Sequence, residues 1–154
     1  MKAIVQRVKK CTVAIRGETN SRIGPGILIL LGVHEQDQES DANFLADKCT
    51  QMRIFPDEDG KMNLSVRDTG GSAMVVSQFT LYGDTRKGNR PNYMQAAKPE
   101  LAEHLYNYFI GRMRFSLGND KVETGVFREM MDIELTNDGP VTIIVETKSA
   151  EEQC

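Results

Sequence analysis

The sequence predicts an α+β fold in which curved, barrel-like sheets of antiparallel or mixed strands carry two helices on their outer side. Three observations lead to this fold class. The chain contains roughly eight short segments with the alternation or the continuous apolar character of β-strands. Only two segments have the spacing of amphipathic helices. Strands and helices do not alternate regularly, which argues against a doubly wound parallel sheet.

The first third of the chain is expected to form strands followed by a helix. The strands occupy residues 3–8, 12–15 and 27–33. Residues 16–20 form a hairpin turn after the second strand, and Gly24-Pro25-Gly26 interrupts the chain before the third. This third strand is continuously apolar, so we expect it to be buried on both faces. The helix runs from about Ser40 to Met52, with Asp37 or Ser40 as its cap.

The rest of the chain supplies another strong strand over residues 74–81, a polar loop over 84–92 and a second helix that begins near Pro99. Leu101, Leu105, Phe109 and Met113 recur along that helix at helical spacing. The remaining strands are expected at 121–124, 131–136 and 141–146. A single domain over residues 1–147 and a polar tail over 148–154 complete the predicted organisation.

Composition excludes several classes of protein. The 154 residues are 40% hydrophobic and 27% charged, and the net charge of −3 argues against a general nucleic-acid coat protein, so no DNA partner is expected. Cys11, Cys49 and Cys154 are scattered and form neither a disulfide framework nor a CxxC metal site. No signal peptide opens the chain, and its longest apolar run, residues 27–31, is too short to span a membrane. We therefore expect a cytoplasmic protein.

The usual catalytic side chains are scarce. His34 and His104 have no partner at a metal-ligand spacing, and we predict neither a metal nor another cofactor. No GxSxG motif marks a nucleophile. A Ser-His-Asp triad stays open, because triads assemble in space rather than in sequence.

Two short signatures stand out instead. Ser77-Gln78-Phe79-Thr80-Leu81 places two hydroxyls and an amide at the end of a buried strand. Asn137-Asp138-Gly139-Pro140-Val141-Thr142 places Gly before Pro in a tight connection between two strands, where a cis peptide or an exposed carbonyl is possible. Any chemistry must therefore use the backbone, hydroxyl groups or the substrate itself.

The loop after the first signature is basic. Arg86, Lys87 and Arg90 bring three cations within five residues, beside Thr85 and Asn89. Such groups on a loop of small residues suit contacts to phosphate. A phosphate-bearing substrate held there would place its reactive end near Ser77 and Thr80.

Over almost its whole length the chain resembles the D-aminoacyl-tRNA deacylase family, also called D-tyrosyl-tRNA deacylases. Any one matching segment is weak evidence, but the ordered set is highly specific. The matching segments are residues 5–8, 31–33, 53–55, 60–65, 77–81, 87–91 and 137–142.

The resemblance implies a carboxylic ester hydrolase that edits tRNA. Such an enzyme cleaves the ester between a D-amino acid and the 3′-terminal adenosine of tRNA, and it also removes glycine from mischarged tRNA. It is a homodimer with its active site at the interface, where a cis Gly139-Pro140 of one subunit enters the partner's pocket. Main-chain carbonyls there hold the amino group of the substrate and exclude an L side chain by clash. Arg7 matches the arginine that packs against this motif.

By the same resemblance, Ser77, Gln78, Phe79 and Thr80 form the pocket floor. Strand alternation prevents all four side chains from facing one substrate unless a bend or strand end intervenes, so some residues must contribute backbone N–H groups to an oxyanion site. Thr80 has been regarded as the nucleophile, whereas a competing view has the 2′-OH of the RNA assist a water. We favour the second view, because no base is visible next to Thr80 and unactivated threonine is a poor nucleophile.

Phe127 and Met131 match residues that line the pocket near the terminal adenosine, and Ala102 matches a small helix residue that faces it. The chain departs from the family at Arg128-Glu129, where Gly and then a small residue are usual. A long cation at this position either contacts the tRNA end or points to solvent.

Two other classes of function remain alternatives. One is a non-catalytic RNA-binding module, which the acidic composition disfavours. The other is an oligomer that binds a small metabolite, in which case the basic loop is incidental.

Overall fold

The structure is a computed structural model that describes residues 1–147, so the predicted tail at 148–154 lies outside it. Its main element is a six-stranded mixed sheet in the order β2-β1-β3-β6-β7, with β8 on the other edge of β1. The pairs that involve β1 are antiparallel, and β6 is parallel to both of its neighbours. The six strands are β1 (Lys2–Ile15), β2 (Glu18–Ile23), β3 (Gly26–Gly32), β6 (Ser72–Ser77), β7 (Val122–Thr124) and β8 (Asp132–Glu146). The predicted α+β class is confirmed.

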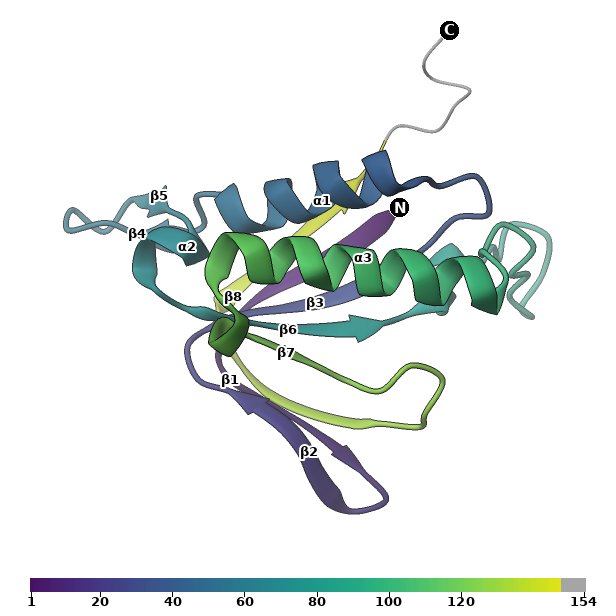
Figure 1. Cartoon of the computed structure of the whole chain (residues 1–154), viewed down its shortest axis with the longest axis horizontal. Helices are drawn as coiled ribbons and strands as arrows, with labels where there is room; N and C mark the ends of the chain where they lie inside the picture. Colours follow the sequence, from purple (N-terminus) through teal and green to yellow (C-terminus); the bar gives the residue numbers. More distant parts are fainter. Residues whose placement is uncertain (148–154) are drawn as a thin grey trace, which may run out of the picture.

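Two long helices, α1 (Glu39–Gln51) and α3 (Pro99–Leu117), lie side by side over one face of the sheet (Figure 1). Each turns an apolar stripe inward: Leu45 and Cys49 on α1, and Phe109 on α3, are 2% exposed or less. These side chains form the larger core with β3 and β6, and burial of this surface is the main force that fixes the helices on the sheet. The two predicted outer helices are therefore present.

A third helix, α2 (Val66–Thr69), is absent from the prediction, which counted only two. A capping box begins it, because the Ser65 hydroxyl accepts from the Asp68 N–H and the Asp68 carboxylate accepts from the Ser65 N–H. At four residues the helix is too short to show periodicity. The remaining short elements are the strand pair β4 (Phe55–Pro56) and β5 (Met62–Leu64) and the 3₁₀ turns η1 (Phe79–Tyr82) and η2 (Asn119–Lys121).

The sheet rolls towards a barrel at the end away from the helices, where β2 and the second half of β1 curl down (Figure 1). Side chains of β2 close most of the gap to β7: the Ser21 hydroxyl and the Asn20 amide donate to the Thr124 carbonyl at 2.7 and 3.2 Å. A second, smaller apolar core that includes Val13 and Met74 fills the roll. The barrel-like curvature expected from the sequence is thus confirmed.

Three predicted strand boundaries are wrong, for reasons of pairing. The strands expected at 3–8 and 12–15 form one strand, β1, because β8 pairs with both halves. The strands expected at 131–136 and 141–146 are likewise one strand, β8. The strand expected over 74–81 ends at Ser77, since its partner β3 ends at the same level. No helix within residues 1–147 is long and apolar enough to cross a membrane.

Candidate active site

A pocket of about 770 Å³ lies where the end of β6, the start of α3 and the segment before β8 meet. Seven residues predicted for the site from the sequence line it together: Ser77, Gln78, Phe79, Thr80, Ala102, Phe127 and Met131. The prediction missed most of the other lining residues, which are Val33, Val76, Tyr93, Ala96, Ala97, Pro99, Glu129, Met130 and Ile133, whereas Arg128 had been noted only as a departure from the family pattern. The small side chains Ala96 and Ala97, close to the predicted Ala102, are the sequence signal that could have indicated an open space here.

The end of β6 brings the first signature to the pocket floor. The strand ladder ends at the pair Leu31 and Ser77, and the Gln78 N–H makes a last bond of 2.8 Å to the Leu31 carbonyl. At Gln78 the backbone leaves the strand and enters the 3₁₀ turn η1. Gly32 allows this turn to lie close, because a Cβ there would be 3.2 Å from the Gln78 carbonyl. Strand alternation therefore stops at Ser77, and all four predicted residues line one pocket.

Two aromatic contacts shape the walls. The Phe79 ring meets Tyr93 edge-on, with centroids 5.1 Å apart, on the segment that leads into α3. Phe127 packs against Tyr106, with centroids 5.8 Å apart. Tyr106 is fixed by a 2.9 Å hydrogen bond from its hydroxyl to the Val75 carbonyl, and burial raises its pKa to about 12. Tyr106 is therefore a protonated donor that holds the wall, not a proton acceptor.

The polar groups in the pocket are few. The Gln78 side-chain amide donates to the Thr80 hydroxyl. The backbone N–H groups of Phe79 and Thr80 have no backbone acceptor within the described part of the chain. Glu129 is the one carboxylate among the lining residues of this pocket, and it lies 3.8 Å from the Arg16 guanidinium. The pocket thus contains three residues with hydroxyl groups, Ser77, Thr80 and Tyr93, and two amide donors without a backbone acceptor. No base is hydrogen-bonded to Thr80 in residues 1–147.

Within residues 1–147, His, Cys, Asp and Glu form no group of three or more that could hold a metal ion. His34 contacts the Tyr82 ring, and His104 lies 2.9 Å from Glu39 on the outer surface. Neither histidine lines the pocket.

The second signature lies elsewhere and has an unexpected form. It is a bulge in the middle of β8, not a connection between two strands. Gln6 pairs with Thr142 and Val8 pairs with Asn137, so the four residues 138–141 stand opposite Arg7 alone. The Gly139-Pro140 peptide bond is cis, and both residues are exposed.

Arg7 contacts this bulge. Its Nε donates to the Asp138 carbonyl at 3.0 Å and lies 3.3 Å from the Asp138 carboxylate, while its Nη1 donates to the Ile54 carbonyl at 2.7 Å. The Arg7 side chain is only 11% exposed. Gly139 has a φ of +127°, a backbone conformation that residues with a Cβ rarely adopt. None of these three predicted residues, Arg7, Gly139 and Pro140, lines the pocket of its own chain.

The basic loop also lies apart from the pocket, since Arg86, Lys87 and Arg90 are absent from its lining. Arg86 is occupied by Asp84, with an Nη2 to Oδ2 distance of 2.6 Å. This hydrogen-bonded pair lowers the pKa of Asp84 to about 2, so both partners stay charged and largely neutralise each other. One of the three cations of the loop is therefore already paired, and Lys87 and Arg90 are the two that make no ion pair within residues 1–147.

Comparisons with known proteins show the family of the chain. The family model described as D-Tyr-tRNA(Tyr) deacylase matches residues 4–146. A D-aminoacyl-tRNA deacylase of Bacillus velezensis is 53% identical over 96% of this chain and 99% of its own length. A protein of the same name from Salinibacter ruber is 52% identical over 98% of this chain and its own full length.

Two solved structures share the fold. The first is titled c-Myc DNA Unwinding Element Binding Protein, with a TM-score of 0.93, 39% identity and coverage of 97% of this chain and 100% of its own. The second is titled a probable eukaryotic D-amino acid tRNA deacylase, with a TM-score of 0.83 over 95% of this chain and 98% of its own. Its 14% identity bears on the fold alone.

Proposed function

Because the chain belongs to the D-Tyr-tRNA(Tyr) deacylase family, we propose that it is an editing hydrolase that cleaves the ester of D-aminoacyl-tRNA to a free amino acid and tRNA. One observation carries the proposal beyond family membership. The four residues Ser77 to Thr80 meet Ala102, Phe127 and Met131, which are distant in sequence, in one pocket of about 770 Å³. That volume is in the range of pockets that bind small molecules, and it suits the aminoacylated nucleoside at the end of a tRNA.

The groups on the pocket floor support hydrolysis without a protein nucleophile. Water adds to the ester carbonyl, and the N–H groups of Phe79 and Thr80 are available to stabilise the oxyanion that forms. The bond to the ribose 3′-oxygen then breaks, and that oxygen takes up a proton. No base contacts Thr80 in residues 1–147, so the vicinal 2′-OH of the RNA is the group we expect to assist the water. Ser77 and Gln78 would position the substrate.

Selection against L substrates would come from a second subunit. Gly139 and Pro140 of the Asp138–Val141 bulge are exposed and do not line the pocket of their own chain, which leaves that pocket without their carbonyls. Apolar side chains beside the pocket are also exposed, with Phe79 at 56% and Met130 at 87%. In a homodimer, the bulge of each subunit would enter the pocket of its partner. This would bury both the bulge and the exposed apolar side chains. The carbonyls of the bulge would bind the substrate's amino group and leave no room for an L side chain.

The same geometry would allow the enzyme to cleave glycyl-tRNA. A glycyl ester has no side chain on either face, so a pocket that excludes L side chains by clash has no means to reject it. Lys87 and Arg90, with Arg86, would contact RNA backbone farther from the ester, since all three are exposed.

The direct test follows ester loss from D-Tyr-tRNA, L-Tyr-tRNA and Gly-tRNA under equal conditions. We expect rapid loss of the D ester, measurable loss of the glycyl ester and no loss of the L ester above the uncatalysed rate. Equal rates for D and L would contradict selection by the bulge. Retention of RNA on a filter with no ester loss would instead support the non-catalytic RNA-binding alternative.

Thr80→Ala is expected to reduce kcat by less than about tenfold, because the backbone N–H groups survive the substitution and the hydroxyl is not activated by a base. A substrate that ends in 2′-deoxyadenosine should lose about 100-fold or more, as it lacks the assisting hydroxyl. Single-turnover rates compare Thr80→Ala with the unmodified enzyme, and the 2′-deoxy substrate with the ordinary one. Abolished turnover in Thr80→Ala, with tRNA binding intact, would restore Thr80 as the nucleophile.

A further inference from the structure

Arg128 stands in a backbone conformation that its side chain does not favour. Residues Val126 to Glu129 form a tight turn, closed by a 3.3 Å bond from the Glu129 N–H to the Val126 carbonyl. Arg128 is the third residue of this turn and has a φ of +69°. Turns with positive φ at this position ordinarily carry Gly or Asn. In residues 1–147 the only other residue besides glycine with positive φ is Arg16, at +53°.

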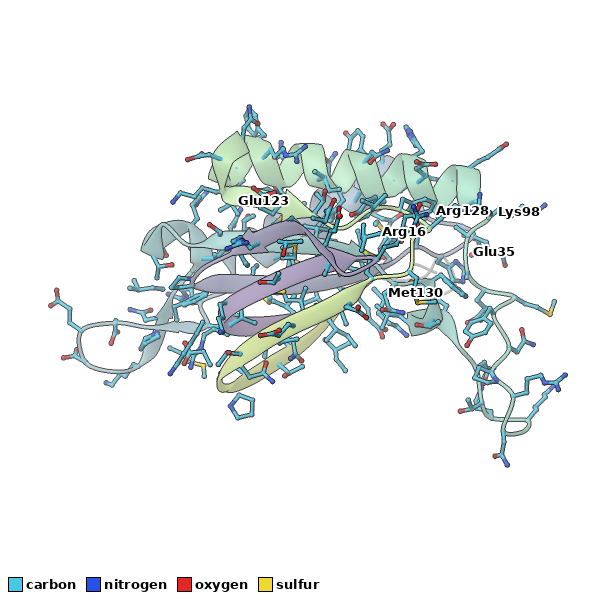
Figure 2. The ribbon with its side chains drawn as sticks, turned by 90° about the horizontal axis from the view of Figure 1, so that it is seen from below. Arg16, Glu35, Lys98, Glu123, Arg128 and Met130 are labelled. Carbon is cyan, nitrogen blue, oxygen red and sulfur yellow. The ribbon has the colours of Figure 1, made fainter. Side chains whose placement is uncertain are left out.

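The turn lies at the pocket. Arg128 lines this pocket and is the one cation among the lining residues. Most of the other lining residues are apolar. Figure 2 shows Arg128 and Met130 on the segment that leads into β8. The exposed Arg128 makes no side-chain hydrogen bond or ion pair within residues 1–147. The neighbouring carboxylate, Glu129, is instead paired with Arg16 at 3.8 Å.

We propose that Arg128 binds the phosphate that joins the terminal nucleoside of the tRNA to the preceding nucleotide. This inference rests on the proposed function, which places the ester at the pocket floor near Ser77 and Thr80. The nucleoside then fills the apolar space beside Phe127, and its 5′-phosphate leaves the pocket at the exposed side. A guanidinium there can form two parallel hydrogen bonds to phosphate oxygens.

The basic loop is a poorer candidate for this phosphate. Arg86, Lys87 and Arg90 do not line the pocket, and Arg86 is held by Asp84 at 2.6 Å. The RNA backbone would therefore contact the protein at two places. Arg128 would bind the terminal phosphate at the pocket, and the basic loop would bind more distant phosphates. Gly would suit the backbone conformation at this position better than Arg does. The Arg128 side chain is therefore better explained by binding than by the needs of the turn.

The experiment compares two small substrates that differ by one phosphodiester group: the D-Tyr ester of adenosine and the D-Tyr ester of the dinucleotide CpA. For Arg128→Gly we expect kcat/KM to fall about tenfold with the CpA ester and less than about twofold with the adenosine ester. Arg128→Lys keeps the charge and should recover part of the loss on CpA. Tm should not fall in Arg128→Gly, because Gly suits the positive φ.

Arg22→Ala is the control. It removes one exposed cation that makes no side-chain hydrogen bond or ion pair within residues 1–147 and does not line the pocket. We expect it to leave the ratio of the two substrates unchanged. An equal loss in both variants, or a loss in Arg128→Gly that is the same for both substrates, would overturn the phosphate contact. Failure of the unmodified enzyme to cleave D-Tyr-tRNA, assayed in parallel, would overturn the proposed function itself.

Discussion

Gly139→Ala is expected to lower kcat/KM for D-aminoacyl-tRNA by about 100-fold or more while the chain still folds. At a φ of +127° a Cβ would lie 3.0 Å from the Val141 N and Cγ2 atoms and 3.3 Å from Arg7 Nη2. The bulge can accept the methyl group only by changing its backbone path. Since Gly139 and Pro140 are exposed, most of this change should reposition their carbonyls and little should affect the core, which the bulge contacts through the partly buried Val141. Steady-state kinetics with D-Tyr-tRNA gives the loss.

Gly118→Ala separates this effect from general strain. Gly118 follows α3, has a φ of +107° and would place its Cβ 3.1 Å from the Asp120 carboxylate. The substitution carries a similar backbone penalty at a position outside both the pocket and the bulge. We expect the two variants to lose similar amounts of Tm, and only Gly139→Ala to lose activity. Activity losses of equal size would show that the bulge has no special part in catalysis.

A mixing experiment tests whether the bulge acts on the partner's pocket. Ala102→Phe should block the pocket, because Ala102 lines it, while the bulge of that chain stays intact. Gly139→Ala has the opposite defect. When the two inactive variants are co-expressed in equal amounts, half of the dimers are mixed, and each has one intact site, so about a quarter of full activity should return. No recovery, with mixed dimers present, would place the bulge and its pocket in the same chain.

The two signatures show what the sequence could predict about the site. The pattern and the family resemblance identified the residues of the pocket floor, but local alternation placed them on a strand that in fact ends at Ser77. That end depends on where β3 stops, which is a long-range pairing that no local pattern encodes. Gly139-Pro140 was predicted as a connection between strands, since Gly and Pro both disfavour strand interiors. The pairing of β1 along both halves of β8 makes it a bulge.

The charged residues illustrate a second limit. Three cations within five residues indicated a phosphate site, yet Asp84 holds Arg86, and the loop lies outside the pocket. Arg128 is an isolated cation that the sequence marks only as a departure from the family pattern, with contact to the tRNA end and exposure to solvent as the two alternatives. Its role depends on the turn that brings it to the pocket and on the pairing of Glu129 with Arg16, and both are properties of the folded chain.

Arg7→Ala is expected to reduce both stability and activity. Arg7 joins two carbonyls from separate parts of the chain, Asp138 at 3.0 Å and Ile54 at 2.7 Å, and its side chain is 11% exposed. Its removal leaves both acceptors without their charged donor, at a cost of about 2–3 kcal/mol in the free energy of unfolding. Tm should fall by roughly 5–10 °C. Without the donor the bulge is free to shift, and a displacement of about 1 Å is enough for a 100-fold loss in kcat/KM.

Two further variants assign that loss to the geometry of Arg7. Arg7→Lys keeps the charge, but its single ammonium cannot donate to both carbonyls in the fixed directions of a guanidinium, so activity should stay low while part of the stability returns. Arg112→Ala removes another double contact, from Arg112 to Asp47 at 2.9 and 3.1 Å, where the side chains are 38% and 39% exposed. That pair joins α3 to α1 away from the bulge, and its loss should lower Tm less than Arg7→Ala does and leave kcat/KM unchanged. If Arg7→Lys kept full activity, the charge on Arg7 would be sufficient. The fork that ties the bulge to Ile54 would then have no part in selecting the D substrate.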